Sequence, residues 1–374
     1  EFVLLRDEGF EIQARQTAVE TEGPLGPNAY TGLTSCVSIN TAAAVRAGAH
    51  RITYEPDLSG KPNPEGLQLR VDGELVQLSA TGVPLGPDGR IIRTPAQGGI
   101  QIEGAGGAVV TITPGWWDYY QLWYLNIDTR SVRATQGIMG AIAPGNWLPA
   151  LPDGSFLGPM PADLNQRYSD LYDKFGKSWR VSDATTLFDY APGASTGTFT
   201  LDSWPLGESP KDCVLPPGLG SGKPPMKTLP AEVAKQVCSN IASEERRAFC
   251  EQDVMVTGEA GFAKTYLETE AVGRNAIPSA PVLVSPEPFA TGLAGPITFA
   301  WREAKDPDQD KVLYRLYVWP VDETPDNNKA VPVPENLSYT ISRLEPGRAY
   351  FWKVIAEDGK GGTVESQTRR FEMK

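Results

Sequence analysis

Three aspartates alternate in the stretch Asp306-Pro-Asp308-Gln-Asp310. Carboxylate oxygens are the ligands that calcium prefers, and alternate aspartates in a loop can surround one such cation. The stretch has no glycine for a sharp bend and no terminal glutamate, so it is not an EF-hand. An acidic turn between strands explains the same residues, because Asp and Pro are common in turns. Two interpretations therefore stay open, an acidic turn and a structural calcium site, and no other cofactor is indicated.

Nucleophilic catalysis has little support in this sequence. The only histidine is His50, which removes the base that most Ser-His-Asp and Cys-His mechanisms need. The glycine-rich stretch at residues 103–107 lacks the following helix and lysine of a phosphate-binding loop. We therefore expect a protein that is not an enzyme.

The four cysteines are Cys36, Cys213, Cys238 and Cys250. None belongs to a CxxC pair, which disfavours zinc, and four cysteines allow three disulfide connectivities. Cys238 and Cys250 lie in two adjacent predicted helices, and an antiparallel pair of helices can bring them to disulfide distance. We predict this bond and, by elimination, a second between Cys36 and Cys213. Both would suit an oxidising, extracellular environment.

Aromatic residues are dense in WWDYYQLWYLNI, residues 116–127. The pattern favours one central strand buried between two layers, because buried aromatics mostly serve packing. The alternative is an exposed aromatic platform for sugar rings or a partner. Trp116 and Trp117 are its best candidates, since they follow the turn residues Pro114 and Gly115.

Length and net charge limit the number of domains and the kinds of partner. A chain of 374 residues suggests two or three domains. A net charge of −12 disfavours nucleic acid and anionic lipid as partners. No run of about 18 apolar residues is present, so no segment is expected to insert into a membrane.

The order of predicted elements gives a mainly β protein. Short alternating runs fill residues 1–205, and the clearest is a hairpin around Asp72-Gly73. A Pro/Gly/Ser-rich linker and three helical segments follow at residues 206–275. Six or seven strands at residues 280–374 predict a sandwich of the immunoglobulin class. The fold class is thus a β-sandwich-like domain, a small helical unit and a second β-sandwich.

Two family resemblances support this division. The segment LYDKFGKSWRV, followed by TTLFDYAPGASTGTFT, resembles the end of a von Willebrand factor type D domain of large surface proteins. The same family is matched in order by EFVLLRD, FEIQAR, SINTAAAVR and GIMG at residues 1–7, 10–15, 38–46 and 137–140. The helical segment resembles one that follows type D domains. The last domain resembles a fibronectin type III domain of bacterial extracellular proteins.

The resemblance implies a secreted or cell-surface structural or adhesive protein, and a carbohydrate-binding module is the alternative. In the loop where type D domains bind calcium, only Asn146 and Asp153 offer ligands, so calcium is not expected there. Met139 stands where disulfide-rich members have cysteine, so mucin-like polymerisation is not implied. The sequon Asn336-Leu337-Ser338 matters only in a glycosylating host.

The resemblance also implies that the chain begins partway into a type D domain. The first strand, with Phe2, Val3, Leu4 and Leu5, is apolar on both faces and is therefore expected to be an interior strand. A missing neighbour would leave an edge for strand addition from another copy, and such contacts repeated head to tail would form a filament. The alternative is a monomer whose edge is covered by a loop. Self-association or another extracellular protein is thus the expected partner, with a glycan as the second possibility.

Overall fold

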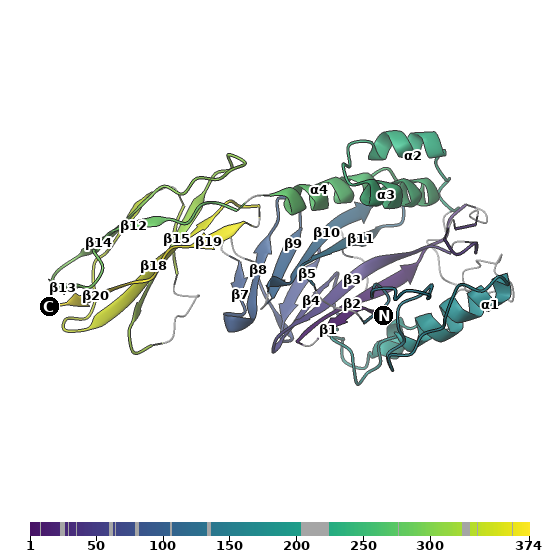
Figure 1. Cartoon of the computed structure of the whole chain (residues 1–374), viewed down its shortest axis with the longest axis horizontal. Helices are drawn as coiled ribbons and strands as arrows, with labels where there is room; N and C mark the ends of the chain where they lie inside the picture. Colours follow the sequence, from purple (N-terminus) through teal and green to yellow (C-terminus); the bar gives the residue numbers. More distant parts are fainter. Residues whose placement is uncertain are drawn as a thin grey trace. The chain divides into compact units, whose positions relative to one another are not determined.

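A computed structural model describes the chain apart from residues 8, 23–26, 29, 35, 60–62, 64, 79–81, 105–106, 133–135, 203–223, 276, 324–329, 335 and 361. The described chain forms two compact units. The first contains Glu1–Gln77 and Ile102–Thr269, and the second contains Leu78–Gln101 and Glu270–Lys374. Strands dominate both units, which confirms the predicted mainly β class (Figure 1).

The first unit begins with a six-stranded antiparallel sheet in the order β1-β2-β3-β4-β5-β6. Its strands are β1 (Phe2–Asp7), β2 (Phe10–Ala18), β3 (Ser38–Ala47), β4 (His50–Glu55), β5 (Gln68–Val71) and β6 (Glu74–Leu75). The predicted hairpin joins β5 to β6. Asp72 and Gly73 both have positive φ, 54° and 89°, which a type I′ turn requires.

A second, five-stranded sheet has the order β11-β10-β9-β8-β7. Its strands are β7 (Val83–Pro84), β8 (Gly89–Arg93), β9 (Ile100–Gly104), β10 (Val109–Trp117) and β11 (Leu122–Arg130). The aromatic stretch is therefore a hairpin, and the expectation of one continuous strand was wrong. Gln121 takes a φ of 54° and donates two hydrogen bonds to Asp118, which closes a turn that contains no glycine.

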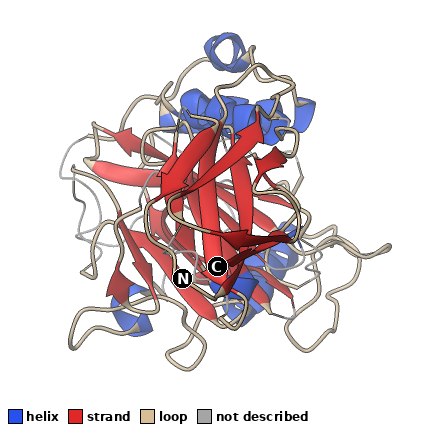
Figure 2. Cartoon of the chain, turned by 90° about the vertical axis from the view of Figure 1, so that its left-hand side faces the viewer, coloured by secondary structure: helices blue, strands red, loops and turns tan. Residues whose placement is uncertain are grey.

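The three predicted helices are present as α2 (Ala231–Cys238), α3 (Glu244–Thr257) and α4 (Phe262–Arg274). Ser243 caps α3 by accepting a hydrogen bond from the Arg246 amide, and Gly258 ends it in the left-handed region. Figure 2 shows these helices gathered on one side of the strands. The α4 helix packs there on the β10–β11 hairpin, because the Phe262 ring stacks on Tyr124 at 3.9 Å.

A further helical segment consists of α1 (Leu164–Tyr168) and the π-helix Ser169–Gly176. It buries Phe175 in a small core with Val3, Trp147 and Trp179. The chain then crosses the first sheet as an irregular segment, residues 179–202, that we call the clasp; within it, η4 (Thr196–Phe199) is a single 3₁₀ turn. Two apolar side chains of the clasp pack on the alanines of β3, since Leu187 and Phe188 share a core with Ala42 and Ala44.

A buried charge network holds the clasp on the sheet. The Arg15 guanidinium binds the carboxylates of Glu1 and Glu55 at 2.9 and 3.0 Å, and all three side chains are at most 5% exposed. The clasp supplies Tyr190, which donates to Glu1 at 2.5 Å, and Phe199, whose ring lies 3.6 Å from the guanidinium carbon. Buried charges of this kind require a full set of partners. The network therefore joins the first strand, the sheet and the clasp.

The second unit is a two-sheet sandwich. One sheet has the order β12-β14-β17 and the other β13-β20-β18-β15-β16, with β19 beside β18. The strands are β12 (Val282–Ser285), β13 (Ala290–Leu293), β14 (Ile297–Arg302), β15 (Leu313–Pro320), β16 (Val331–Val333), β17 (Ser338–Ile341), β18 (Ala349–Glu357), β19 (Thr363–Glu365) and β20 (Arg369–Met373). Phe299, Trp352 and Phe371 are fully buried between the sheets and form edge-to-face pairs.

This unit also contains a hairpin from far earlier in the chain, formed by β7 (Val83–Pro84) and β8 (Gly89–Arg93) around η1 (Gly86–Asp88). Glu357 lies on the side of β18 that faces away from the aromatic core. It is only 9% exposed and pairs with Arg315 of β15.

We predict that Arg15→Met destabilises the first unit by about 3–5 kcal/mol, because two buried carboxylates would lose their cation. The free energy of unfolding is measured by chemical denaturation, with hydrogen exchange of the β2 amides as the signal. The matched control is Arg6→Met, whose ion pair with Glu11 is 30% exposed on the arginine side and should cost less than about 1 kcal/mol. Equal losses in the two variants would contradict a central role for Arg15.

Candidate functional sites

The predicted assembly edge, Phe2 to Leu5, is occupied by the chain itself. On one side β1 pairs with β2. On the other side the Val3 amide donates to Trp179 O at 2.9 Å, while the amides of Ile138 and Met139 donate to Val3 O and Leu4 O. The prediction of a strand with two neighbours is therefore correct, but the expectation that another copy supplies one of them was wrong. These strand-edge groups are no template for a filament.

The two tryptophans of the predicted platform lie in different environments. Trp117 is fully buried against Phe262 and Tyr120, so its proposed exposure was wrong. Its neighbour Trp116 points to the opposite side of β10, is half-buried, and lies 5.2 Å from Trp123 on β11. Strand alternation explains the difference, because consecutive residues face opposite sides. Of the predicted pair, only Trp116 remains available to a ligand.

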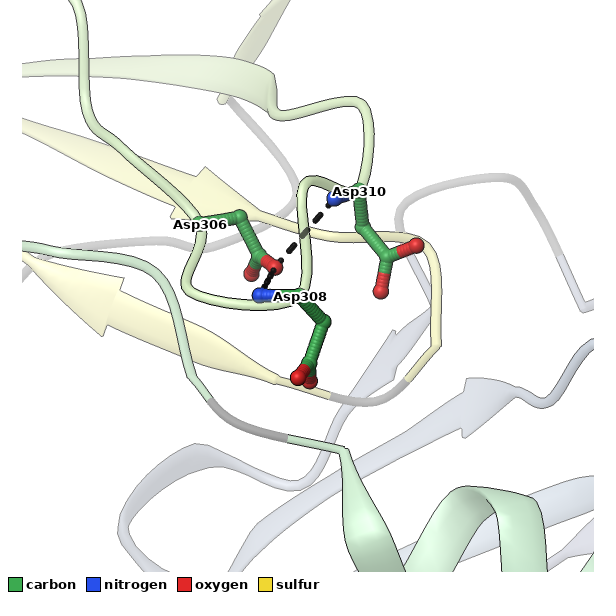
Figure 3. A group of neighbouring side chains, drawn as sticks. All are labelled: Asp306, Asp308 and Asp310. Atoms are coloured by element: carbon green, nitrogen blue, oxygen red, sulfur yellow. Dashed lines mark hydrogen bonds between the residues drawn. The ribbon is translucent and has the colours of Figure 1, made fainter.

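The acidic loop brings its three carboxylates together, as Figure 3 shows. One ligand atom of each of Asp306, Asp308 and Asp310 lies within 4.8 Å of the others. One Asp306 oxygen accepts hydrogen bonds from the amides of Asp308 and Asp310, at 2.8 and 3.3 Å. The other oxygen of Asp306 and one of Asp310 are buried without a hydrogen-bond partner. These free oxygens suit a hard cation, although three carboxylates provide only part of a calcium shell.

A lysine competes for the same carboxylates. The Lys360 ammonium lies 2.6 Å from Asp310 Oδ1, and this hydrogen bond raises the pKa of Lys360 above its usual range. The lysine thus supplies one positive charge to the loop. A bound calcium ion would have to share or displace it.

Cys238 and Cys250 form the predicted disulfide, with their Cα atoms 6.0 Å apart. It joins α2 to α3, and both residues are fully buried in the core beneath the helices. Cys36 is also disulfide-bonded. Its predicted partner, Cys213, lies outside the described residues. No described cysteine is free.

One long loop of the first unit exposes large apolar side chains, and we call residues 139–164 the apolar loop. Its most exposed members are Met139 (51%), Ile142 (48%), Phe156 (44%) and Met160 (40%). Its backbone is ordered, since the Trp147 amide donates to Gly158 O and the Leu151 amide to Ser155 O. Asn146 and Asp153 lie here as well: Asn146 donates to backbone oxygens, and Asp153 accepts from Ser155. No motif had marked the apolar loop as a surface.

Several charged side chains with unusual environments were also missed by the sequence analysis. Burial raises the pKa of Glu55 to about 7, although Arg15 acts in the opposite direction. Because the side chains of Glu1 and Glu55 are fully buried, the pair serves the fold and is closed to a substrate. His50 pairs at 2.8 Å with Asp72 at the tip of the neighbouring hairpin, which suits a turn-stabilising contact.

Comparison with known proteins defines the second unit as a β-sandwich module of a known class. Residues 292–372 match the fibronectin type III domain family, so the chain carries such a domain at its C-terminal end. The matched segment lies outside residues 1–205 and gives no support to the type D resemblance. No curated protein matches the chain.

Part of the chain is also similar to solved structures. The chicken CNTN1 FN1-FN3 domains are 17% identical, with 26% of this chain and 33% of that chain covered and a TM-score of 0.21. A myokine is 18% identical, with 26% and 97% covered and a TM-score of 0.21. The domain of human fibronectin type III domain containing protein 3 is 24% identical, with 26% and 85% covered and a TM-score of 0.20. This chain therefore spans about a third of the CNTN1 fragment.

We predict a pH dependence in the helical layer that originates at Asp253. Its carboxylate accepts a hydrogen bond from Tyr266 at 2.7 Å, and burial raises its pKa from 3.8 to about 6. The folded state then holds this proton more tightly than the unfolded state, so stability falls as the pH rises from about 4 to about 6. Asp253→Asn keeps an oxygen for Tyr266 and should remove this fall.

The measurement is the denaturant concentration at which α3 and α4 are half unfolded, detected by hydrogen exchange at pH 4 and at pH 7. Glu245→Gln on the exposed side of α3 is the control and should retain the wild-type pH dependence. An unchanged dependence in Asp253→Asn would assign the effect to another group.

Proposed function

We propose that this protein is a non-enzymatic, extracellular structural or adhesive protein. The observation that supports the proposal most directly is the fibronectin type III domain, a module that commonly serves adhesion or structure outside cells. The buried disulfide between Cys238 and Cys250 agrees with it, because disulfides persist in oxidising environments. None of the described helices is long and apolar enough to cross a membrane.

The apolar loop is the surface that suits a protein partner best. Exposed large apolar side chains on an ordered backbone are characteristic of protein contacts, because burying them is favourable and little backbone entropy is lost. The Trp116–Trp123 pair is a smaller candidate and would suit a sugar ring. We therefore place adhesion at the apolar loop, with a protein as the partner and a glycan as the alternative.

The first test concerns location and thiol state. The protein is detected on unpermeabilised source cells or in their medium, and its cysteines are alkylated before peptide mapping. We expect the chain outside the cells with Cys238 joined to Cys250. A chain found inside the cells with free thiols would contradict the extracellular proposal.

We predict that the double variant Phe156→Ser, Met160→Ser lowers attachment of source cells to a surface coated with the chain by at least several-fold. The matched control is Phe249→Ser, which removes an exposed phenylalanine (56%) from α3 and should leave attachment unchanged. Attachment that is insensitive to the loop variant but lost in Trp116→Ala, together with binding to one sugar on a glycan array, would favour the carbohydrate-binding alternative.

We also propose a structural calcium site in the acidic loop, on the basis of its convergent carboxylates and buried free oxygens. Three carboxylates predict weak binding, at about 10⁻⁴–10⁻³ M, as in other extracellular modules. Calorimetric titration of the full chain with calcium chloride measures it. We expect Asp308→Asn to weaken binding and Lys360→Met to strengthen it, because the competing ammonium is removed.

Asp322→Asn, a change in an exposed carboxylate that pairs with Arg348, should leave calcium binding unchanged. The calcium proposal is overturned if neither variant changes calcium binding, that is, if Lys360→Met does not strengthen it and Asp308→Asn does not weaken it. The loop would then be an acidic turn neutralised by its lysine.

A further inference from the structure

The sequon Asn336-Leu337-Ser338 is the only N-x-Ser/Thr sequence in the chain, and it stands directly before a strand of the fibronectin unit. Asn336 and Ser338 are both exposed, and β17 begins at Ser338. An acceptor asparagine must carry a bulky, hydrophilic oligosaccharide at the surface. The structure offers that space, because no part of this tripeptide belongs to the buried core.

The strand that follows the sequon lies at the edge of its sheet. In the order β12-β14-β17, the described part of the chain gives β17 one neighbour, β14. The pairing with β14 is regular, from Ile297 opposite Ile341 to Ala300 opposite Ser338. Its sequence, SYTI, combines β-branched and aromatic residues and contains no charge. Such an edge can pair with a strand of another chain.

Three other edge strands of the same unit, β12, β13 and β16, carry features that disfavour this pairing. Pro332 lies in the middle of β16, and a strand with proline cannot donate a full set of hydrogen bonds. The register of β12 shifts between Leu283 and Ser285, and that of β13 between Ala290 and Leu293. Shifts of this kind bend an edge away from a partner. Neither a proline nor a register shift interrupts β17.

We propose that Asn336 is an N-glycosylation site whose oligosaccharide shields the β17 edge from pairing with another chain. The glycan would be attached two residues before the strand and would occupy the solvent beside it. The glycan would prevent strand pairing at this edge, as the proline and the register shifts do at β16, β12 and β13. The inference rests on the extracellular location proposed above, because the modification requires passage through a glycosylating secretory pathway.

The test uses the full chain, expressed with a secretion signal in a eukaryotic host. Peptides are treated with a glycosidase that releases N-linked glycans in ¹⁸O water, so that an occupied Asn336 becomes a labelled aspartate. We expect the label at Asn336 and its loss in Ser338→Ala, which keeps the asparagine. Ser338→Thr preserves the sequon and should stay glycosylated. An unlabelled Asn336, from a host that glycosylates a reference protein in the same culture, overturns the assignment.

Sedimentation at increasing concentration tests the shielding role. We expect Asn336→Gln to self-associate several-fold more than the glycosylated chain. Adding Thr340→Lys to Asn336→Gln places a charge on the edge and should restore the monomer. A monomeric Asn336→Gln chain, or association that Thr340→Lys does not relieve, overturns the shielding role. Because the added signal directs the chain to the secretory pathway, these outcomes are independent of the protein's natural location, which the thiol-state experiment tests separately.

Discussion

One buried guanidinium is the constraint on which the first unit depends. Arg15 lies between two carboxylates, Glu1 and Glu55, and beneath the ring of Phe199. A buried ion of this kind is tolerated only when its partners are all in place, since each lost partner leaves an uncompensated charge. The first strand, the fourth strand and the clasp must therefore close around it together. Tyr190 and Glu1 are 189 residues apart in sequence, so the unit depends on long-range contacts, and such contacts slow folding.

The same closure explains why β1 is not an open edge. Once the clasp lies over Arg15, Trp179 O accepts from the Val3 amide, and residues 136–139 bind the rest of the strand. The polar groups of β1 are thus satisfied within the chain, which is the usual requirement for buried backbone. In the described part of the second unit, β16 carries a proline and the pairings of β12 and β13 carry register shifts. The two units therefore protect their strand edges in different ways.

Local signals in the sequence were sufficient for much of the fold. The Asp72-Gly73 hairpin, the capped helix α3 and the disulfide between Cys238 and Cys250 depend on residues close in sequence, and all were predicted. For the acidic loop the sequence left two interpretations open, an acidic turn and a calcium site, and the structure brings the three carboxylates close together. What remained open was whether a cation or Lys360, which lies 50 residues later, provides the opposing charge.

The errors have two physical causes, an unusual local turn and contacts between residues remote in sequence. Gln121 supplies a left-handed turn residue without glycine, so composition did not show that the aromatic stretch folds back on itself. Trp117 is buried because α4 covers that face of the hairpin, and the helix lies about 140 residues later in the chain. The neighbours of β1 and the partners of Arg15 are similarly remote.

This separation also limits where a partner can bind without disturbing the fold. Trp117 and the Arg15–Glu55 ion pair are buried, so a ligand that reached them would have to open a core or separate a buried ion pair. The apolar loop and the β17 edge differ in this respect, because their side chains are exposed while their backbone is already held by hydrogen bonds. A contact there would bury apolar surface or form strand hydrogen bonds, and little conformational entropy would be lost. A partner that bound these exposed surfaces would therefore disturb the fold least, and one of the surfaces lies beside a candidate glycan acceptor.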